Sequence, residues 1–329
     1  MTYRKIAQIA GVSLSTVSKV LSGSSEISKD TAERVRRIAE EYGVVRPKYR
    51  HDRPNIRIAI LVPEIISIYY SQKVTEIINE MERLDIEPCI YIVGFSNERF
   101  HQIVEQIVDE GRINGILSLD HSFYAKIVEI PFLYLCQANK GPRHDTLWAD
   151  LNEGVYEAIE YLTRLGHQRI GFIGEKNTSS KLEYFKSAVS RLGLEINPKD
   201  IFISDKRFEE IGYEGAAYFA KRRERPTALL AAYDEVALGA IHAFKNYGIS
   251  VPDDISIIGI NDIPFSSYAD VPLTTIRTYN EELTHLAVKM LLDKIKQPDQ
   301  HPVQHIAIQC ELVVRDTTAR VKVKSEKEQ

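Results

Sequence analysis

The chain has few cysteines, little glycine or proline, and no long apolar run. Its 329 residues include three cysteines, 17 glycines and 13 prolines. Cys89, Cys136 and Cys310 stand singly in apolar surroundings, so we expect buried thiols and neither a disulfide framework nor a zinc site. The scattered glycines and prolines exclude a collagen-like repeat and a long low-complexity region. Most of the chain is therefore expected to fold.

Membrane and secretion signals are also missing from the sequence. The longest apolar stretches, such as residues 58–62, are far shorter than the ~18–20 residues of a membrane-spanning helix. The basic start at residues 1–6 is not followed by the apolar core of ~7–15 residues that a secretory signal contains. We therefore expect a cytoplasmic protein with no membrane partner.

Motifs of the common enzyme classes are absent as well. The sequence contains no Gly-x-Ser-x-Gly elbow, no Gly-x-Gly-x-x-Gly, no phosphate-loop Gly-x-x-x-x-Gly-Lys and no metal-spaced histidine pair. His121, His144, His167 and His242 are interpreted as structural or solvated side chains. We expect no enzymatic activity, no metal and no cofactor.

Charge is distributed unevenly along the chain. Residues 1–57 contain 12 Lys or Arg against 6 Asp or Glu, which gives this head a net charge of +6. The rest of the chain carries 30 basic and 40 acidic groups, so the total is −4. A basic head on an acidic body indicates that only the head approaches a polyanion, although charge alone fits a solvated helix face equally well.

The head has the pattern of three short helices. Residues 4–10 place apolar side chains at helical spacing, and Gly11 ends this helix. Ser13 and Ser28 are the expected caps of a second and a third helix. Two short helices joined by a tight turn and completed by a third set the second helix into a DNA major groove. The alternative is a three-helix bundle for protein contacts.

Side chains of the second helix divide into two groups by their expected role. Those that point away from the core near its N-terminal end and are expected to reach base edges are Leu14, Ser15 and Lys19. Those better placed for phosphate contacts or capping are Ser13, Thr16 and Ser18.

Residues 6–21, which read Ile-Ala-Gln-Ile-Ala-Gly-Val-Ser-Leu-Ser-Thr-Val-Ser-Lys-Val-Leu, carry a resemblance. This run is similar to the headpiece of the lactose repressor and galactose repressor family of bacterial transcription regulators. The resemblance implies that Leu14, Ser15 and Lys19 read an operator, with Leu14 on a thymine methyl group and Lys19 on guanine. It also implies a homodimer on pseudo-palindromic double-stranded operator DNA.

The linker at residues 46–57 departs from that family. It is polar and basic, and its two prolines oppose a continuous helix. The leucine that wedges into the minor groove in family members is missing, so the sequence does not predict DNA bending by intercalation. Arg46, Lys48 and Arg50 are candidates for phosphate or minor-groove contacts, with a plain flexible tether as the alternative.

Beyond residue 56, short apolar runs alternate with longer amphipathic segments. The expected strands are residues 58–62, 89–93, 115–119, 169–173, 201–204, 228–232 and 255–260. The expected helices are residues 70–84, 100–110, 154–165, 182–192, 213–222 and 236–247. This alternation predicts parallel sheets covered by helices on both faces. The predicted fold class is α/β, with an all-α helix-turn-helix headpiece before the doubly wound sheets.

The resemblance extends over about residues 3–318 and implies a periplasmic-binding-protein-like body of two lobes joined by three crossovers. Segments that carry it include Leu-Gly-His at 165–167, Val-Pro-Asp-Asp-Ile at 251–255 and Pro-Leu-Thr-Thr-Ile at 272–276. We expect crossovers near Arg164, Arg277 and Ala307. The predicted parts are a headpiece (1–45), a linker (46–57), a body (58–318) and a polar tail (319–329). Within the body, lobe 1 is expected at 58–164 and 278–306, and lobe 2 at 165–277 and 307–318.

Open parallel sheets bind ligands at the carboxyl ends of their strands, and polar and aromatic residues follow the expected strands here. Such groups suit a hydroxyl-rich ring such as a sugar, and turn or cap chemistry is the alternative. In the family's effector pocket, the resemblance places matching acids at Asp150 and Asp234. It places substitutions for the usual Arg, Gly, Asn and Asp at Lys181, Tyr184, Tyr233 and Asn261. Further aromatic candidates are Tyr69, Tyr70 and Trp148.

The resemblance thus implies a sequence-specific DNA-binding regulator, a repressor by family default and otherwise an activator. Its operator affinity would be controlled by a small effector, a sugar or amino-sugar derivative. Lys181 cannot make the two-pronged contact of arginine, so a different ligand geometry is expected. The tail lacks the leucine heptads that tetramerise some relatives, which favours dimers. The rival interpretation is a two-lobed solute-binding protein without a DNA role.

Overall fold

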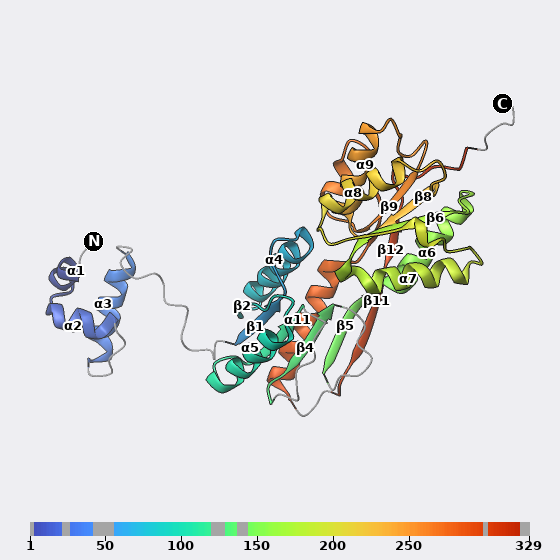
Figure 1. Cartoon of the computed structure of the whole chain (residues 1–329). Helices are drawn as coiled ribbons and strands as arrows, with labels where there is room; N and C mark the ends of the chain where they lie inside the picture. Colours follow the sequence, from blue (N-terminus) through green and yellow to red (C-terminus); the bar gives the residue numbers. More distant parts are fainter. Residues whose placement is uncertain are drawn as a thin grey trace, which may run out of the picture. The chain divides into compact units, whose positions relative to one another are not determined.

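The computed structural model describes residues 3–21, 27–41, 56–119, 129–136, 144–298 and 302–322. The chain forms two compact units, Met1–Asn55 and Ile56–Gln329 (Figure 1). The candidate DNA contacts Arg46, Lys48 and Arg50 lie outside the described residues. Among the residues described, no helix is long and apolar enough to cross a membrane.

The first unit contains the three predicted helices: α1 (Tyr3–Ala10), α2 (Leu14–Leu21) and α3 (Lys29–Glu41). Their inward side chains form one small core, in which the fully buried members include Ile6, Val17, Val35 and Ala39. Gly11 has a φ of +65° and lets the chain turn out of α1, while Val12 N donates to Ala7 O at 3.0 Å. The helical part of the fold-class prediction is confirmed.

The first sheet of the second unit is parallel, and its described strands have the order β11-β5-β4-β3-β1-β2. The strands are β1 (Arg57–Val62), β2 (Glu87–Ile92), β3 (Gly115–Ser118), β4 (Phe132–Cys136), β5 (Asp145–Asp150) and β11 (His305–Gln309). One face packs on α4 (Ile68–Arg83) and α11 (Asn280–Lys296), and the other on α5 (Asn97–Glu110). We call this sheet with its three helices the first lobe.

The second sheet has the order β12-β10-β9-β8-β6-β7 among the described strands, with β12 alone antiparallel to its neighbour. Its strands are β6 (Ile170–Glu175), β7 (Ile201–Ser204), β8 (Ala228–Ala231), β9 (Ser256–Asn261), β10 (Thr274–Arg277) and β12 (Glu311–Val313). Its long helices are α6 (Leu151–Arg164), α7 (Ser179–Arg191), α8 (Glu209–Ala220) and α9 (Asp234–Asn246). Shorter segments are η1 (Lys176–Thr178), η2 (Pro198–Asp200) and α10 (Phe265–Tyr268). Together they form the second lobe.

Helices cover both faces of the second sheet, as predicted. The apolar side chains of α6 and α7 bury one face, and those of α8 and α9 bury the other (Figure 1). Two glycines allow α8 and α9 to pack closely, because a Cβ on Gly212 would lie 2.2 Å from Val236 O. A Cβ on Gly239 would lie 2.5 Å from Glu209 O. The α/β fold class and the doubly wound, parallel-dominated sheets are confirmed.

The crossovers between the lobes differ in part from the expected positions. The buried side chains of α6, including Val155 and Ile159, pack on the second sheet, so the chain crosses at Asp150 and not near Arg164. The second crossover follows β10, directly after Arg277, where we expected it. The third falls at Cys310 between β11 and β12, beyond the expected position near Ala307, because residues 305–309 pair with β5.

The predicted tail also begins too early. Val321 N donates to Leu165 O at 3.0 Å, and Ser256 Oγ accepts a hydrogen bond from Ala319 N at 3.0 Å. His167 lies 3.0 Å from Ala319 O through Nε2 and 2.9 Å from Thr227 Oγ1 through Nδ1. Residues 319–321 therefore belong to the second lobe, and His167 is structural, as the sequence analysis expected.

Candidate functional site

The N-terminus of α2 is capped by the serine that the sequence predicts. Ser13 Oγ accepts a hydrogen bond from Thr16 N at 3.0 Å and lies 2.8 Å from Thr16 Oγ1. Ser15 Oγ lies 2.7 Å from the same Ser13 oxygen. These hydroxyl groups thus order the first turn of α2, the end of the helix that enters the major groove in helix-turn-helix proteins.

One face of α2 is exposed and mixed in character. Its exposed residues include Ser18 together with the three predicted base readers, Leu14, Ser15 and Lys19. Val17 and Val20, on the opposite side, are buried in the headpiece core. Leu14 is 44% exposed, so a large apolar side chain stands in solvent at the start of a helix that also carries a lysine. Apolar contact with a thymine methyl and hydrogen bonding to guanine need these two side-chain types.

In the second unit, a cavity of about 400 Å³ lies between the two lobes. It is lined by residues at or just after the carboxyl ends of several strands, including Phe95, Leu119, Lys176, Arg207 and Asn261. Residues of α4 and α7 complete the wall, among them Tyr70 and Lys181. The position agrees with the rule that open parallel sheets hold ligands outside the carboxyl ends of their strands.

The structure brings five of the nine proposed effector-binding residues to this cavity: Tyr69, Tyr70, Lys181, Tyr233 and Asn261. Three others lie away from its wall. Trp148 is half-buried on β5, and Asp150 caps α6 by accepting from Glu153 N at 3.5 Å. Tyr184 is half-buried on α7, where it packs against the core formed with α6. Burial and the nearby charge of Asp150 raise the pKa of Tyr184.

Asp234, the ninth residue, is a structural carboxylate and does not line the cavity. Its side chain is fully buried and accepts hydrogen bonds from Thr275 Oγ1 at 2.5 Å, Ile263 N at 2.8 Å and Ser266 Oγ at 2.9 Å. Burial raises its pKa to about 6 despite these bonds. Asp234 therefore ties α9 to β10 and to the segment that leads into α10.

The next residue along α9, Glu235, faces the cavity instead. It is 8% exposed, and its Oε2 has no hydrogen-bond partner among the described residues. Burial raises the pKa of this carboxyl group. A buried carboxylate oxygen without a partner is costly unless a ligand supplies a donor. The hydroxyl group of a bound molecule is a suitable donor.

Lys181 is a buried residue of the second lobe's cavity wall. Its Nζ donates to Ala232 O at 2.8 Å and lies 4.0 Å from the centre of the Tyr233 ring. Burial lowers the pKa of Lys181 to about 8, although the charges of Glu235, Asp234 and Glu175 act in the other direction. The Lys181 ammonium is thus held by a carbonyl and an aromatic face, without an ion pair to any carboxylate that the structure describes.

Arg207, just after β7, joins the two lobes at the cavity. Its Nη1 lies 2.5 Å from Glu64 Oε2 of the first lobe, and its Nε lies 3.2 Å from Glu175 Oε2 of the second. Tyr233 donates from its hydroxyl group to the other oxygen of Glu175 at 3.0 Å. The guanidinium also lies 5.4 Å from the ring centre of Phe95, which belongs to the first lobe. These contacts hold the lobes in one relative position.

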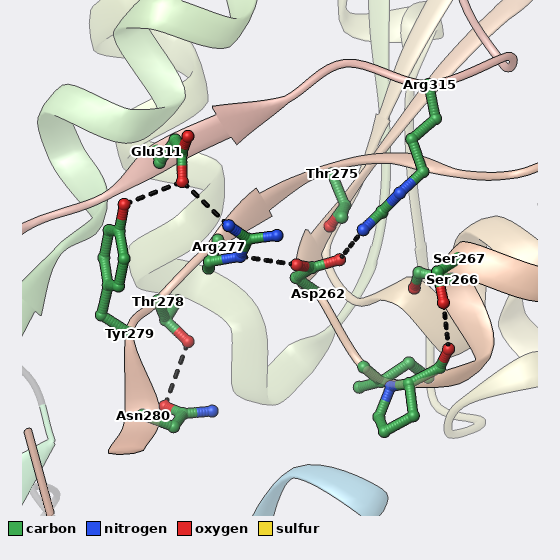
Figure 2. A network of polar contacts seen from close by, with 12 residues as sticks. Asp262, Ser266, Ser267, Thr275, Arg277, Thr278, Tyr279, Asn280, Glu311 and Arg315 are labelled. Atoms are coloured by element: carbon green, nitrogen blue, oxygen red, sulfur yellow. Dashed lines mark hydrogen bonds and ion pairs between the residues drawn. The ribbon is translucent and has the colours of Figure 1, made fainter. Parts of the chain in front are cut away.

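Strained backbone flanks the cavity on the second lobe. Phe208 has a φ of 54°, Asn261 a φ of 117° and Asp262 a φ of 54°, all in the region that favours glycine. Such conformations persist only where the surroundings enforce them, and they concentrate at ligand-binding sites. At Asp262 the enforcement is visible, because its carboxylate accepts from Arg277 Nε at 2.8 Å and from Arg315 Nη2 at 2.7 Å (Figure 2).

The same network connects two crossovers. Arg277 also donates from Nη1 to Glu311 Oε2 at 3.0 Å, and the Tyr279 hydroxyl donates to that oxygen at 2.8 Å (Figure 2). Arg277 and Tyr279 flank the second crossover, and Glu311 begins the strand after the third. Two of the three connections between the lobes are therefore held together by charge-assisted hydrogen bonds.

Sequence reasoning missed several residues of the cavity, notably Lys73, Phe95, Arg207 and Glu235. Phe95 and Arg207 follow β2 and β7, so the strand-end rule would have found them if applied to every strand. Lys73 lies on the buried side of α4 together with Val74 and Ile77. A charged residue inside such an apolar stripe is the sequence signal that could have identified Lys73 as a candidate. No sequence pattern distinguishes Glu235 as a cavity residue, because the resemblance assigns the matching acid to its neighbour Asp234.

Substitution of the two neighbouring acids of α9 should change the free energy of unfolding by different amounts. Asp234→Ala leaves three buried donors without an acceptor, so the free energy of unfolding should fall by on the order of 3 kcal/mol. Glu235→Gln removes a buried charge that lacks one partner, and the change should stay within about 1 kcal/mol. Urea unfolding followed by circular dichroism measures both. Equal losses in the two variants would contradict the assignment of Asp234 as structural and Glu235 as a cavity group.

Lys181 predicts a specific pH dependence of stability. Its pKa of about 8 in the folded chain lies below its ordinary value of 10.5, so the unfolded chain binds more protons between these values. The contribution of Lys181 to stability should therefore rise by on the order of 3 kcal/mol as the pH increases from about 8 to 10.5. Urea unfolding of wild type and Lys181→Met across this range isolates the effect. A constant difference between the two proteins would show that the folded chain does not depress this pKa.

The chain is similar to proteins of known families. Residues 2–45 match the family model for bacterial regulatory proteins of the lacI family, and residues 159–318 match a periplasmic binding protein-like domain. The HTH-type transcriptional repressor PurR of Haemophilus influenzae is 30% identical over 345 residues, which cover 97% of this chain and 99% of that protein.

Two solved structures share the fold. The Lac repressor dimer bound to operator and the anti-inducer ONPF has a TM-score of 0.74 at 24% identity, covering 97% of this chain and 99% of that one. A LacI family transcriptional regulator from Enterococcus faecium with bound ribose has a TM-score of 0.69 at 24% identity, covering 81% and 100%. The match of the headpiece to the family model and the 30% identity to PurR over 97% of this chain confirm the resemblance to this family. This chain belongs to the lacI family of bacterial regulatory proteins and is a DNA-binding transcription regulator.

Proposed function

We propose that this protein is a repressor that binds a pseudo-palindromic operator as a homodimer and is controlled by a small hydroxyl-rich effector in the cavity between its lobes. The proposal rests on the presence, in one chain, of an exposed helix face suited to DNA and a cavity suited to a small molecule. An α2 face exposes Leu14, Ser15 and Lys19, and a cavity between two sheets contains Glu235 Oε2, which has no hydrogen-bond partner in the part of the chain that the structure describes. The solved relatives support each half, one with operator and one with ribose.

In this proposal the base readers are Leu14, Ser15 and Lys19, while Ser13 and Thr16 organise the first turn of α2 and Ser18 contacts phosphate. The effector is held by Tyr69, Tyr70, Lys181, Tyr233, Glu235 and Asn261, all of which line the cavity. Glu235 replaces Asp234 in this set, since Glu235 lines the cavity and the Asp234 carboxylate is taken up by hydrogen bonds within the second lobe. The aromatic rings suit the apolar faces of a sugar ring, and the carboxylate and amide suit its hydroxyl groups.

Control of DNA binding follows from the position of the cavity. A molecule that contacts both walls binds one relative arrangement of the lobes better than others and shifts the population toward it. The shift is transmitted to the spacing of the two headpieces in the dimer. Such coupling is reciprocal, so DNA must change the affinity for the effector by the same factor as the effector changes the affinity for DNA.

The proposal is tested by sequencing the genomic fragments that the purified protein retains at near-physiological salt, where non-specific binding is weak. Wild type should enrich one pseudo-palindromic site. Lys19→Ala should lose most of this selectivity, since a specific base contact is worth about 1–3 kcal/mol. Lys186→Ala, a change of an exposed lysine on α7 of the body, is the matched control and should behave as wild type.

Two results would contradict parts of this proposal. Unchanged selectivity of Lys19→Ala would remove Lys19 from the base-reading residues. Failure of wild type to enrich any site, with and without added sugars, would favour a two-lobed ligand-binding protein whose basic head serves another polyanion.

A further inference from the structure

The first-lobe wall of the cavity contains a buried lysine. It lies on the face of its helix where the sequence pattern predicts an apolar residue. Lys73 lies on α4 between Tyr70 and Ile77, and its side chain is only 2% exposed. Val74 and Ile77 of the same helix are buried in the core of the first lobe. Lys73 itself lines the cavity. A lysine this buried is retained only where its charge has a partner or a use.

The contacts that the structure describes for Lys73 are with neutral groups. Its Nζ donates to Asn280 Oδ1 at 2.8 Å and to the Tyr69 hydroxyl at 3.4 Å, and it lies 5.2 Å from the centre of the Tyr69 ring. No carboxylate of the described residues forms an ion pair with it. Glu76, one turn further along α4, is influenced by its charge but does not reach it, and burial raises the pKa of that carboxyl group.

Basic groups dominate the rest of the cavity wall. Of the described lining residues, Lys73, Lys176, Lys181 and Arg207 are basic, and Glu235 is the one acid. Lys176 is neutralised by Asp205 at 2.6 Å, and Arg207 by Glu64 and Glu175. This leaves the ammonium groups of Lys73 in the first lobe and Lys181 in the second without an ion-pair partner among the described residues. One buried ammonium group on each lobe thus lines the same cavity.

We infer that the effector carries an anionic group, a carboxylate or a phosphate on a hydroxyl-rich scaffold, and that Lys73 is the anchor for this group. The inference rests on the proposed function and specifies the ligand class of the same cavity. An anion would supply the partner that Lys73 lacks, while Glu235 and Asn261 would take hydroxyl groups. A free amine would meet two ammonium groups, so of the sugar-like ligands the acidic ones fit and the basic amino sugars do not.

Lys73 is also linked to a crossover between the lobes. The oxygen that accepts its hydrogen bond, Asn280 Oδ1, accepts a second one from Thr278 Oγ1 at 3.1 Å (Figure 2). Thr278 lies in the second crossover and lines the cavity. An anion that draws Lys73 toward itself therefore competes with its contact to Asn280, the side chain that also accepts from Thr278 of the second crossover.

The experiment is thermal unfolding of the full chain with added anions at constant ionic strength, with chloride as the balance. The anionic probes are inorganic phosphate, gluconate, glucuronate and glucose 6-phosphate, and the neutral probes are glucose and ribose. We expect at least one anionic probe to raise the melting temperature of wild type in a saturating manner, by more than its neutral counterpart. Phosphate-bearing and carboxylate-bearing probes separate the two sources of the anion.

Variants assign the effect to Lys73. In Lys73→Met the apparent dissociation constant of the stabilising anion should increase at least about tenfold, because a charge-assisted contact is lost. The same variant should melt at a higher temperature than wild type without ligand, because a buried charge without an ion pair is removed. A lysine with a purely structural role would lower the melting temperature when replaced. Lys186→Met, at an exposed and ion-paired lysine outside the cavity, should match wild type in both respects.

Three outcomes overturn the inference: no anionic probe stabilises wild type, neutral probes stabilise it as strongly as anionic ones, or Lys73→Met retains the anion response. None of these removes the proposed function. Stabilisation by glucose or ribose alone would keep a sugar effector and reject the anion. Loss of operator selection in the fragment experiment would reject the regulator whether or not anions bind.

Discussion

The arrangement of the cavity depends on the burial of charged side chains between two lobes, which three crossovers in the described residues connect. Arg207 lies between Glu64 of the first lobe and Glu175 of the second, and Glu175 is 3% exposed. Buried ion pairs add little net stability relative to apolar packing, but breaking one leaves a costly uncompensated charge. The Arg207 contacts therefore define which arrangement of the lobes is allowed more than they strengthen the fold. Any rearrangement must give Glu64 and Glu175 another partner, either water or a ligand.

The same principle organises the rest of the site. Asp262 keeps a strained backbone because Arg277 and Arg315 hold its carboxylate. Arg277 also donates a hydrogen bond to Glu311 at the third crossover. Lys73, by contrast, donates to two neutral groups, Asn280 next to the second crossover and Tyr69 on its own helix. Paired charges thus fix the connections between the lobes, whereas the cavity wall also contains two lysines, Lys73 and Lys181, without an ion pair among the described residues. A ligand that supplies an ion-pair partner to these lysines therefore acts next to the paired charges that hold the crossovers.

The sequence predicted the architecture well because helix and strand patterns depend on local periodicity. The three headpiece helices, the Ser13 cap and the alternation of strands and helices follow from apolar spacing and turn residues. β4 and β5 were not predicted, because the eight residues that separate them in the sequence are too few to show the amphipathic pattern of a crossover helix. The crossover before α6 was misplaced because amphipathicity shows that α6 has an inward face without showing which sheet receives it.

The cavity was predicted only in part, since its composition depends on contacts between distant segments. Tyr233 and Asn261 were found because they follow strands, and the structure confirms that both line the cavity. Asp234 and Glu235 are adjacent in the sequence, and only the positions of Thr275, Ile263 and Ser266 decide which one is structural. Arg207 and Glu64 are far apart in the chain, so no local sequence pattern predicts their ion pair.

The central claim is that the arrangement of the lobes controls DNA binding, and it can be tested without knowing the effector. The measurement is the dissociation constant of the retained genomic fragment for wild type, Arg207→Met and Arg191→Met. Arg191 is the control, since it pairs with Glu153 and stacks on Tyr156 within the second lobe. The account predicts that Arg207→Met changes the DNA dissociation constant at least about fivefold, the lower end of typical coupling, and that Arg191→Met leaves it unchanged. Identical DNA affinity of all three folded proteins would contradict it.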